Sequence, residues 1–430
     1  MNYRSGILSS HAALKRKERI APGPPVLMRT GYSLTRLRGK PGSFFALVIS
    51  GLVSITLIAF AIGKPISTFQ IYPLEITRVM DADVAPDSRQ VAFVVQRVVS
   101  STGSATLAFF NDLQVWDFHK KSLIAQKTLW EGQAAPDIFL TRVVRYSHDG
   151  RSIVFSDGNT VHVLNTSNYE ERNRFSLAPF PGAGGSWGSN ILRVSPDDRK
   201  VAVYLADTVR FAATIRIYDI GTGHLDREFV PHMGVGSGGL AWSPDGTRLA
   251  FIWLPVHPGE DLPPDARNVR IVNVASGDDV SSFSTGYVAG PVQFLSDAVV
   301  ITASKNPDPD HFGDDTIKFW DVKTGRLLRQ IANPDTGIRN ELGVSSDGRR
   351  IMGYTGKERY NELTHDNEIL EQRFRVWDSE TGKVLATSPA ILPMEFVYGL
   401  ELRLSLKGDL VLVWGINGKV LPTVYELPRM

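Results

Sequence analysis

One pattern constrains the fold more than any other feature of the chain: a unit of about fifty residues that recurs seven times after residue 66. The clearest copy runs from Gly238 to Gly277. In it Leu240 and Trp242 alternate with small neighbours, as in a half-buried strand, and residues 243–246 (Ser-Pro-Asp-Gly) have tight-turn chemistry. The copy predicts four strands in one sheet. Such a sheet leaves two open edges and too small a core, so the copies should need one another.

The register of the copies is set by an acidic or amide residue that ends each third strand. Successive residues of this kind lie 48, 54, 54, 48, 57 and 48 positions apart. They are Asp117, Asn165, Asp219, Asn273, Asp321, Asp378 and Glu426. Seven copies that all read as strands predict an all-β fold, a seven-bladed β-propeller of four-stranded antiparallel blades over residues 66–430.

The seventh copy has no fourth strand of its own, because the chain ends shortly after Glu426. A spare extended stretch, Phe69 to Ile76, precedes the first copy. We expect this stretch to complete the seventh blade. The ring would then close, and no sheet edge would stay open between the last blade and the first.

Residues 44–62 form a run of nineteen residues without a charged side chain. As a helix this run spans roughly 28 Å, close to the hydrocarbon thickness of a bilayer. A single transmembrane helix is therefore predicted. Arg36, Arg38 and Lys40 precede it, whereas only Lys64 follows directly. The positive-inside rule then places the N-terminus in the cytoplasm and the propeller outside it.

A cleaved signal peptide is the alternative interpretation of the same segment. Residues 59–61 (Ala-Phe-Ala) have the small-x-small cleavage pattern, and a start at Met28 would give a leader of ordinary length. The protein would then be secreted or periplasmic instead of anchored.

The charge of the chain is unevenly distributed. Residues 1–43 carry nine Lys or Arg and one acid, a net charge of +8, whereas the whole chain has +2. Residues 21–25 are rich in Pro and Gly, so the head is expected to be a disordered cytoplasmic tail that meets anionic lipid. The acidic remainder gives no basis for nucleic-acid binding. The absence of cysteine excludes disulfides and thiolate metal sites.

Three third strands end in Trp-Asp, at residues 116–117, 320–321 and 377–378, and this ending resembles the WD-repeat propellers. The segment from Ala241 to Gly246 resembles the repeats of TolB-type bacterial periplasmic propellers. The resemblance covers about residues 66–430 and implies a propeller, but no single activity. The copies do not each carry the Gly-His dipeptide of strict WD repeats, so the His-based network of that family is not expected.

Long insertions fall in the same connection, between second and third strands: Ser101–Asn111, Pro255–Arg267, Ser304–Asp315 and Gly356–Gln372. In a propeller these connections share one face, and the opposite face keeps the tight turns. Binding residues concentrate on elaborated loops of a rigid scaffold. We therefore expect binding at this loop-rich face, with His257, Asp310, His311, Phe312, Tyr360 and His365 as candidate residues.

Two motifs with catalytic or cofactor associations lack their required context. Residues 184–188 fit Gly-x-Ser-x-Gly and residues 234–239 fit Gly-x-Gly-x-x-Gly, but a strand follows each where a helix is needed. No catalytic residue, cofactor or metal is predicted. The favoured function is a non-catalytic scaffold that binds proteins or peptides. The alternative is a lactonase-like or other hydrolase with its site at the channel mouth.

Overall fold

The computed structural model describes fifteen segments of the chain. They are residues 65–68, 76–100, 107–132, 143–157, 159–178, 187–207, 212–229, 239–252, 268–285, 291–303, 316–332, 337–361, 366–389, 400–415 and 420–427. All belong to the second of two compact units, Ile55–Met430. The predicted tail and the predicted helix at 44–62 lie outside them. Within them, no helix is long and apolar enough to cross a membrane.

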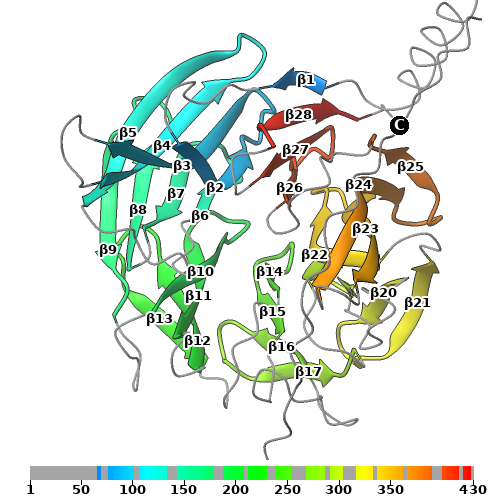
Figure 1. Ribbon diagram of the computed structural model, residues 1–430. Helices are drawn as coiled ribbons and strands as arrows, with labels where there is room; N and C mark the ends of the chain where they lie inside the picture. The colour runs from blue at the N-terminus through cyan, green and yellow to red at the C-terminus, as the bar shows by residue number, and fades with distance from the viewer. Residues whose placement is uncertain are drawn as a thin grey trace, which may run out of the picture. The chain divides into compact units, whose positions relative to one another are not determined.

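The described residues form a seven-bladed β-propeller in which each blade is a four-stranded antiparallel sheet, as predicted (Figure 1). Blade 1 contains β2 (Ile76–Val84), β3 (Gln90–Ser100), β4 (Leu107–Asp117) and β5 (Ser122–Gly132). Blade 2 contains β6 (Val143–Tyr146), β7 (Ser152–Ser156), β8 (Thr160–Asn165) and β9 (Glu171–Ser176). Blade 3 contains β10 (Trp187–Val194), β11 (Lys200–Asp207), β12 (Ala212–Asp219) and β13 (Leu225–Phe229).

The remaining blades follow in chain order around the ring. Blade 4 contains β14 (Leu240–Trp242), β15 (Arg248–Ile252), β16 (Val269–Asn273) and β17 (Asp279–Phe283). Blade 5 contains β18 (Val292–Ser296), β19 (Val299–Thr302), β20 (Thr316–Asp321) and β21 (Leu327–Ala332). Blade 6 contains β22 (Gly337–Val344), β23 (Arg350–Asn361), β24 (Asp366–Asp378) and β25 (Val384–Thr387). Blade 7 contains β26 (Leu400–Leu404), β27 (Leu410–Gly415), β28 (Thr423–Glu426) and β1 (Pro65–Thr68).

The first strand of the chain closes the ring, as expected, but with different residues. β1 pairs with β28, from Pro65 opposite Tyr425 to Thr68 opposite Thr423. The closing strand thus lies upstream of the predicted stretch. Ile76 instead begins β2, opposite Val98 of β3. Blade 1 uses this end of the stretch for its own innermost strand.

The apolar core of the described residues lies between the blades. Each of its seven clusters combines side chains from two adjacent blades. At the closing boundary Leu412 and Trp414 of blade 7 pack with Val91 and Phe93 of blade 1, and all four are fully buried. A blade alone would expose both apolar faces, so the ring supplies the burial that each sheet lacks.

In blades 1 to 6 the residue that ends the third strand caps the turn to the fourth. The carboxylate of Asp321 accepts hydrogen bonds from the backbone N–H and the hydroxyl of Thr324, both at 2.8 Å. Asp378 is bonded in the same way by Thr381, at 2.7 and 2.6 Å. These bonds lower the pKa of both carboxyls. The Trp-Asp endings are therefore turn caps, with a local reason for the acid.

Candidate functional site

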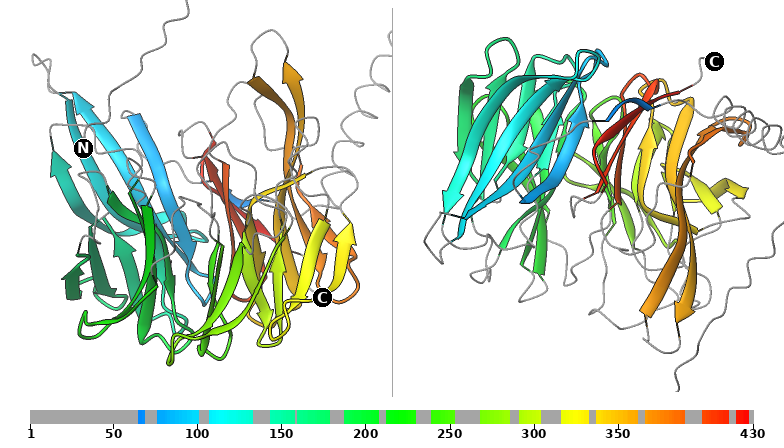
Figure 2. Two further views of the ribbon diagram at one scale, coloured as in Figure 1. Left: turned by 90° about the horizontal axis from the view of Figure 1, so that it is seen from below. Right: turned by 45° about the horizontal axis from the view of Figure 1, so that its top comes forward.

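The loop-rich face carries two hairpins that extend well beyond the other blades. β3 and β4 form eleven residue pairs, and β23 and β24 form twelve, whereas β7–β8 and β15–β16 form five each. β11 and β12 of blade 3 form eight pairs. At about 3.4 Å per residue, the two hairpins thus reach roughly 10 Å beyond blade 3 and roughly 20 Å beyond blades 2 and 4. Both extensions rise on the same side of the ring, from blades 1 and 6 (Figure 2). Blade 7 lies between them.

These hairpins correct the prediction that residues 101–111 and 356–372 are loops. β4 already begins at Leu107, β23 continues to Asn361 and β24 begins at Asp366. Strand pairing therefore continues into both segments: β3 with β4 up to the pair Ser100–Leu107, and β23 with β24 up to the pair Asn361–Asp366. The other two insertions, at 255–267 and 304–315, lie outside the described residues.

The candidate binding residues are only partly placed by the structure. Tyr360 lies in β23 close to the end of the blade 6 hairpin, paired with Asn367 of β24. The other candidates lie outside the described residues: His257, Asp310, His311, Phe312 and His365. Their convergence on one site stays a prediction.

The extended part of blade 1 is cross-linked by the buried carboxylate of Asp112. It accepts hydrogen bonds from Arg97 Nε at 2.6 Å, Gln126 Nε2 at 3.1 Å and Thr128 Oγ1 at 2.8 Å. The donors come from β3 and β5, on either side of β4. The Arg97 guanidinium also lies 4.7 Å from the centre of the Phe110 ring. The carboxylate thus holds three strands of the extension together.

Charged side chains from three blades meet on the innermost strands of the ring. Asp81 of β2 accepts hydrogen bonds from Arg145 of β6 and, at 3.1 Å, from Nη2 of Arg403 of β26. Asp81 and Asp83 also accept the backbone N–H groups of residues 144 and 146, at 2.9 and 2.8 Å. Blade 1 is thereby held to blade 2 on one side and to blade 7 on the other.

The two carboxylates of this cluster differ in their environment. Asp81 faces both guanidinium groups at hydrogen-bond distance, whereas the Arg403 Nε lies 3.8 Å from Asp83 Oδ1. Burial raises the pKa of Asp83, and the charges of Arg145 and Arg403 oppose this only in part. Asp81 is the strong ion-pair partner, and Asp83 acts mainly as an acceptor for the neighbouring blade.

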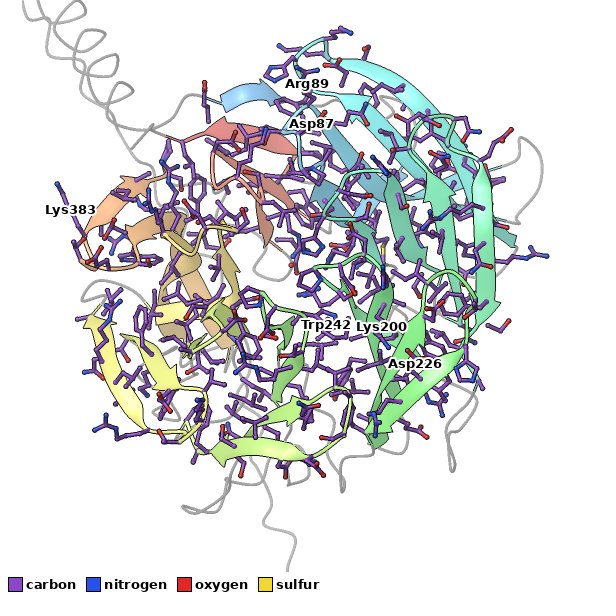
Figure 3. The ribbon with its side chains drawn as sticks, turned by 180° about the vertical axis from the view of Figure 1, so that it is seen from behind. Asp87, Arg89, Lys200, Asp226, Trp242 and Lys383 are labelled. Atoms are coloured by element: carbon purple, nitrogen blue, oxygen red, sulfur yellow. The ribbon has the colours of Figure 1, made fainter. Side chains whose placement is uncertain are left out.

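A sequence pattern indicates this cluster, but it lies on first strands and not on the inserted loops where the candidate residues were expected. Three copies end their first strand with the same pattern: an aliphatic residue, Arg, any residue and Ser. Its arginines are Arg145, Arg193 and Arg403. Because first strands are innermost, an Arg at one register in three of them indicates charge near the axis. In blade 4 the residue at this register is Ala241. The residue after it, Trp242, is labelled in Figure 3 and donates its indole N–H to the carbonyl of Arg193 at 2.9 Å.

His162 lies between two carboxylates in blade 2, near the connection between the second and third strands. Its ring lies 2.6 Å from Glu171 Oε2 and 3.3 Å from Asp157 Oδ2, and it stacks on Phe155 with centroids 4.6 Å apart. Burial opposes the charged form of His162, but the two carboxylates outweigh it and raise its pKa. Within the described segments, no group of His, Asp and Glu has the arrangement of a metal site.

Comparisons with known proteins add no family to these observations. No protein-family model and no curated protein matches the sequence.

Proposed function

We propose that this protein is a membrane-anchored propeller that binds other proteins or peptides through its loop-rich face and catalyses no reaction. The observation that supports this most is the pair of long hairpins on blades 1 and 6, on one face and on either side of blade 7. Elaborated segments on a rigid ring are the usual location of recognition residues.

The chemistry of the described charges favours binding over catalysis. The carboxylates of Asp81 and Asp112 are engaged by guanidinium, amide and hydroxyl donors that join strands or blades. His162 is held between two carboxylates. Each of these groups is engaged by other side chains of the ring. We therefore expect a bound protein or peptide to contact the polar side chains of the hairpins and the neighbouring loops.

A capture experiment with the full chain in detergent tests the face. The tagged protein is incubated with membrane extract of its source, and the captured proteins are compared with those of Tyr360→Ala and Phe312→Ala. Lys383→Ala, on the turn between β24 and β25, is the matched control (Figure 3). Partners lost in the first two variants and retained in the control support the proposal. Partners lost only in the control would place recognition on the opposite face.

The anchor belongs to the same proposal, because residues 44–62 have the length and the composition of a spanning helix. The N-terminus is then cytoplasmic and the propeller extracytoplasmic, with the basic tail at the anionic leaflet. N-terminal sequencing of the mature protein tests it. An intact N-terminus together with extraction only by detergent supports the anchor, and a new terminus at Ile62 would replace it with a cleaved leader.

The resemblance to WD-repeat and TolB-type propellers also stays a proposal. It rests on the three Trp-Asp strand ends and on the Ser-Pro-Asp-Gly turn at 243–246.

A further inference from the structure

Four boundaries between blades share one contact near the rim. The residue eight positions after the third-strand cap lies on the fourth strand and donates a hydrogen bond to a turn carbonyl of the next blade. Asn173 donates to Ile220 at 2.8 Å and Arg227 to Ala275 at 2.6 Å. Ser281 donates to Val322 at 2.5 Å, and Arg329 donates to Ser379. We call this the rim contact.

The accepting turn is equally constrained at these four boundaries. Four positions after its cap, each has a glycine with positive φ: Gly223, Gly277, Gly325 and Gly382. At Gly223, with φ of 72°, an added Cβ would lie 2.6 Å from the Cβ of Phe175 on the preceding blade. Glycine is required here both for its backbone conformation and for the close approach of the neighbouring strand.

The boundary between blades 1 and 2 departs from this pattern on both sides. The donor position on β5 is Ala125, which has no polar side chain. The glycine position on the turn of blade 2 is Tyr169, with φ of 57°. A bulky residue in the left-handed region is strained, and such strain is retained where the surroundings or the function demand it. The Tyr169 hydroxyl donates to Gln90 of blade 1 at 3.2 Å.

A groove of about 500 Å³ opens where the rim contact is missing. Its floor is apolar, formed by Leu113, Val115 and Leu164, and Ala125 and Tyr169 line it above. Lys127 stands on one wall, and residues 168–171 form the other. Of the turn residues that follow Asn165, Asn168 lines the groove, and among the blade 1 residues whose side chains are described none donates a hydrogen bond to its carbonyl.

Alanine at the donor position does not by itself open a groove. Ala386 has the same place in blade 6, but it is buried and packs in one cluster with Tyr425 and Leu427. Ala125 is only half-buried among the described residues, and Leu123 and Ile124 beside it expose 43% and 42% of their surface. Leu327 and Leu328, at the same places in blade 5, are equally exposed, so this apolar edge is not by itself a sign of a groove. The groove therefore depends on what surrounds the alanine and not on the alanine alone.

We propose that this groove binds an arginine side chain of a partner protein, with an apolar neighbour of that arginine resting on Leu123 and Ile124. The template is within the chain: Arg227 spans the corresponding boundary between blades 3 and 4 and donates to the carbonyls of Ala275 and Ser276. An arginine entering from outside would find an apolar floor for its stem and turn carbonyls for its guanidinium.

The charges around the groove agree with a cationic guest. Glu170 is exposed on the turn and is bonded by the side-chain amide of Asn168 at 2.8 Å. Glu171 is paired with His162, so Glu170 is the acidic group at the mouth. Lys127 is the cation of the lining, and its flexible stem allows it to swing away from the floor. This surface lies on the outer wall and is distinct from the loop-rich face.

The first test fills the groove from within. Ala125→Arg in the full chain re-creates the rim contact, and we expect the melting temperature to rise by about 2 °C. Ala386→Arg is the matched control, because Leu427 covers that position, and we expect its melting temperature to fall. A fall in Ala125→Arg equal to that of the control would overturn the assignment of an open arginine position.

The second test measures binding directly. The probe is N-acetyl-leucyl-arginine amide, and its citrulline analogue has the same shape without the charge. We expect saturable binding of the arginine probe to the wild type, about tenfold weaker binding of the citrulline analogue, and loss of binding in Ala125→Arg. Tyr360→Ala should bind the probe normally. Equal binding of the two probes, or undiminished binding in Ala125→Arg, would contradict the proposal.

Discussion

The two faces of the propeller differ in how closely neighbouring blades are bonded to one another. On the tight-turn face, neighbouring blades are bonded turn to turn: Asp198 accepts the backbone N–H groups of His148 and Asp149, at 2.6 and 2.8 Å, and Asp297 accepts that of Asp245 at 3.0 Å. On the loop-rich face the hairpins of blades 1 and 6 project beyond the ring. The difference indicates that the tight-turn face fixes the geometry of the ring, whereas hairpins on the other face can lengthen beyond it.

Removing the closing strand should have the largest effect on the ring. A chain that lacks residues 65–68 loses β1, so β28 becomes an open edge and blade 7 keeps three strands. We expect the melting temperature to fall by more than about 10 °C and the protein to aggregate. Circular dichroism and light scattering measure both. An unchanged cooperative transition would show that the ring does not depend on closure by β1.

Breaking the charged cluster on the innermost strands should have the next largest effect. Asp81→Ala removes the carboxylate that Arg145, Arg403 and the N–H of Val144 share, and we expect the free energy of unfolding to fall by about 3 kcal/mol. Urea unfolding at pH 7 measures it. A loss below about 1 kcal/mol would mean that water replaces the carboxylate there.

Asp83→Asn is the matched control for this cluster. It keeps an acceptor for the N–H of Tyr146 and removes a charge that burial disfavours, so we expect a change within about 1 kcal/mol at pH 7. Because folding raises the pKa of Asp83, the wild type should gain stability over this variant as the pH falls to 4 and below. Opposite behaviour would make Asp83 an ion-pair partner as strong as Asp81.

Loss of one rim contact should lower the free energy of unfolding by less than the loss of Asp81 does. Arg227→Ala removes two hydrogen bonds to the turn of blade 4, at 3.1 and 2.6 Å, from an exposed position. We expect a loss of about 1 kcal/mol in the free energy of unfolding, measured with urea. His224→Ala lies nearby on an exposed turn and should be neutral. Equal losses in both variants would indicate a general effect of this rim and not the cross-blade bonds.

The contribution of His162 should depend on pH. Its pKa is raised in the folded state, so its stabilising effect is complete below the ordinary value of about 6.5 and is lost as the pH rises through the folded value. His162→Gln should therefore cost about 1 kcal/mol at pH 6 and progressively less above it. Melting curves across this range measure the difference. A cost that stays constant across this pH range would contradict the role of the charged imidazole.

The sequence predicted the blades well because each cap residue has a local cause. Asp321 and Asp378 end their strands where a turn needs an acceptor, and that requirement is visible in the chain. The closing strand was placed too late, because the length of blade 1 depends on a pairing between Ile76 and Val98. The blade 6 hairpin cannot be told from a loop in the sequence, since residues 356–372 show no apolar alternation. The groove beside Ala125 depends on how the side chains of blade 2 pack against blade 1, and the spacing of the copies does not reveal that packing.

The sharpest test of the contrast between the faces is a change that affects recognition and leaves stability intact. Beyond Gly356, where β22 ends its pairing, the blade 6 hairpin is two-stranded, so its tip carries none of the ring. Lys357 and Glu371 are paired and can be joined by an Asn-Gly turn in place of residues 358–370. We expect a melting temperature within about 1 °C of the wild type and loss of the partner captured through Tyr360.

The corresponding cut in blade 1 is the informative control, because there the extension is shared by all four strands. β2 pairs up to Val98 and β5 up to Phe109, so a hairpin shortened below that level leaves the ends of β2 and β5 without neighbours. We expect this variant to melt several degrees lower. If both cuts lower the melting temperature equally, the blade 6 hairpin is part of the scaffold. The loop-rich face would then owe its recognition to the connections alone.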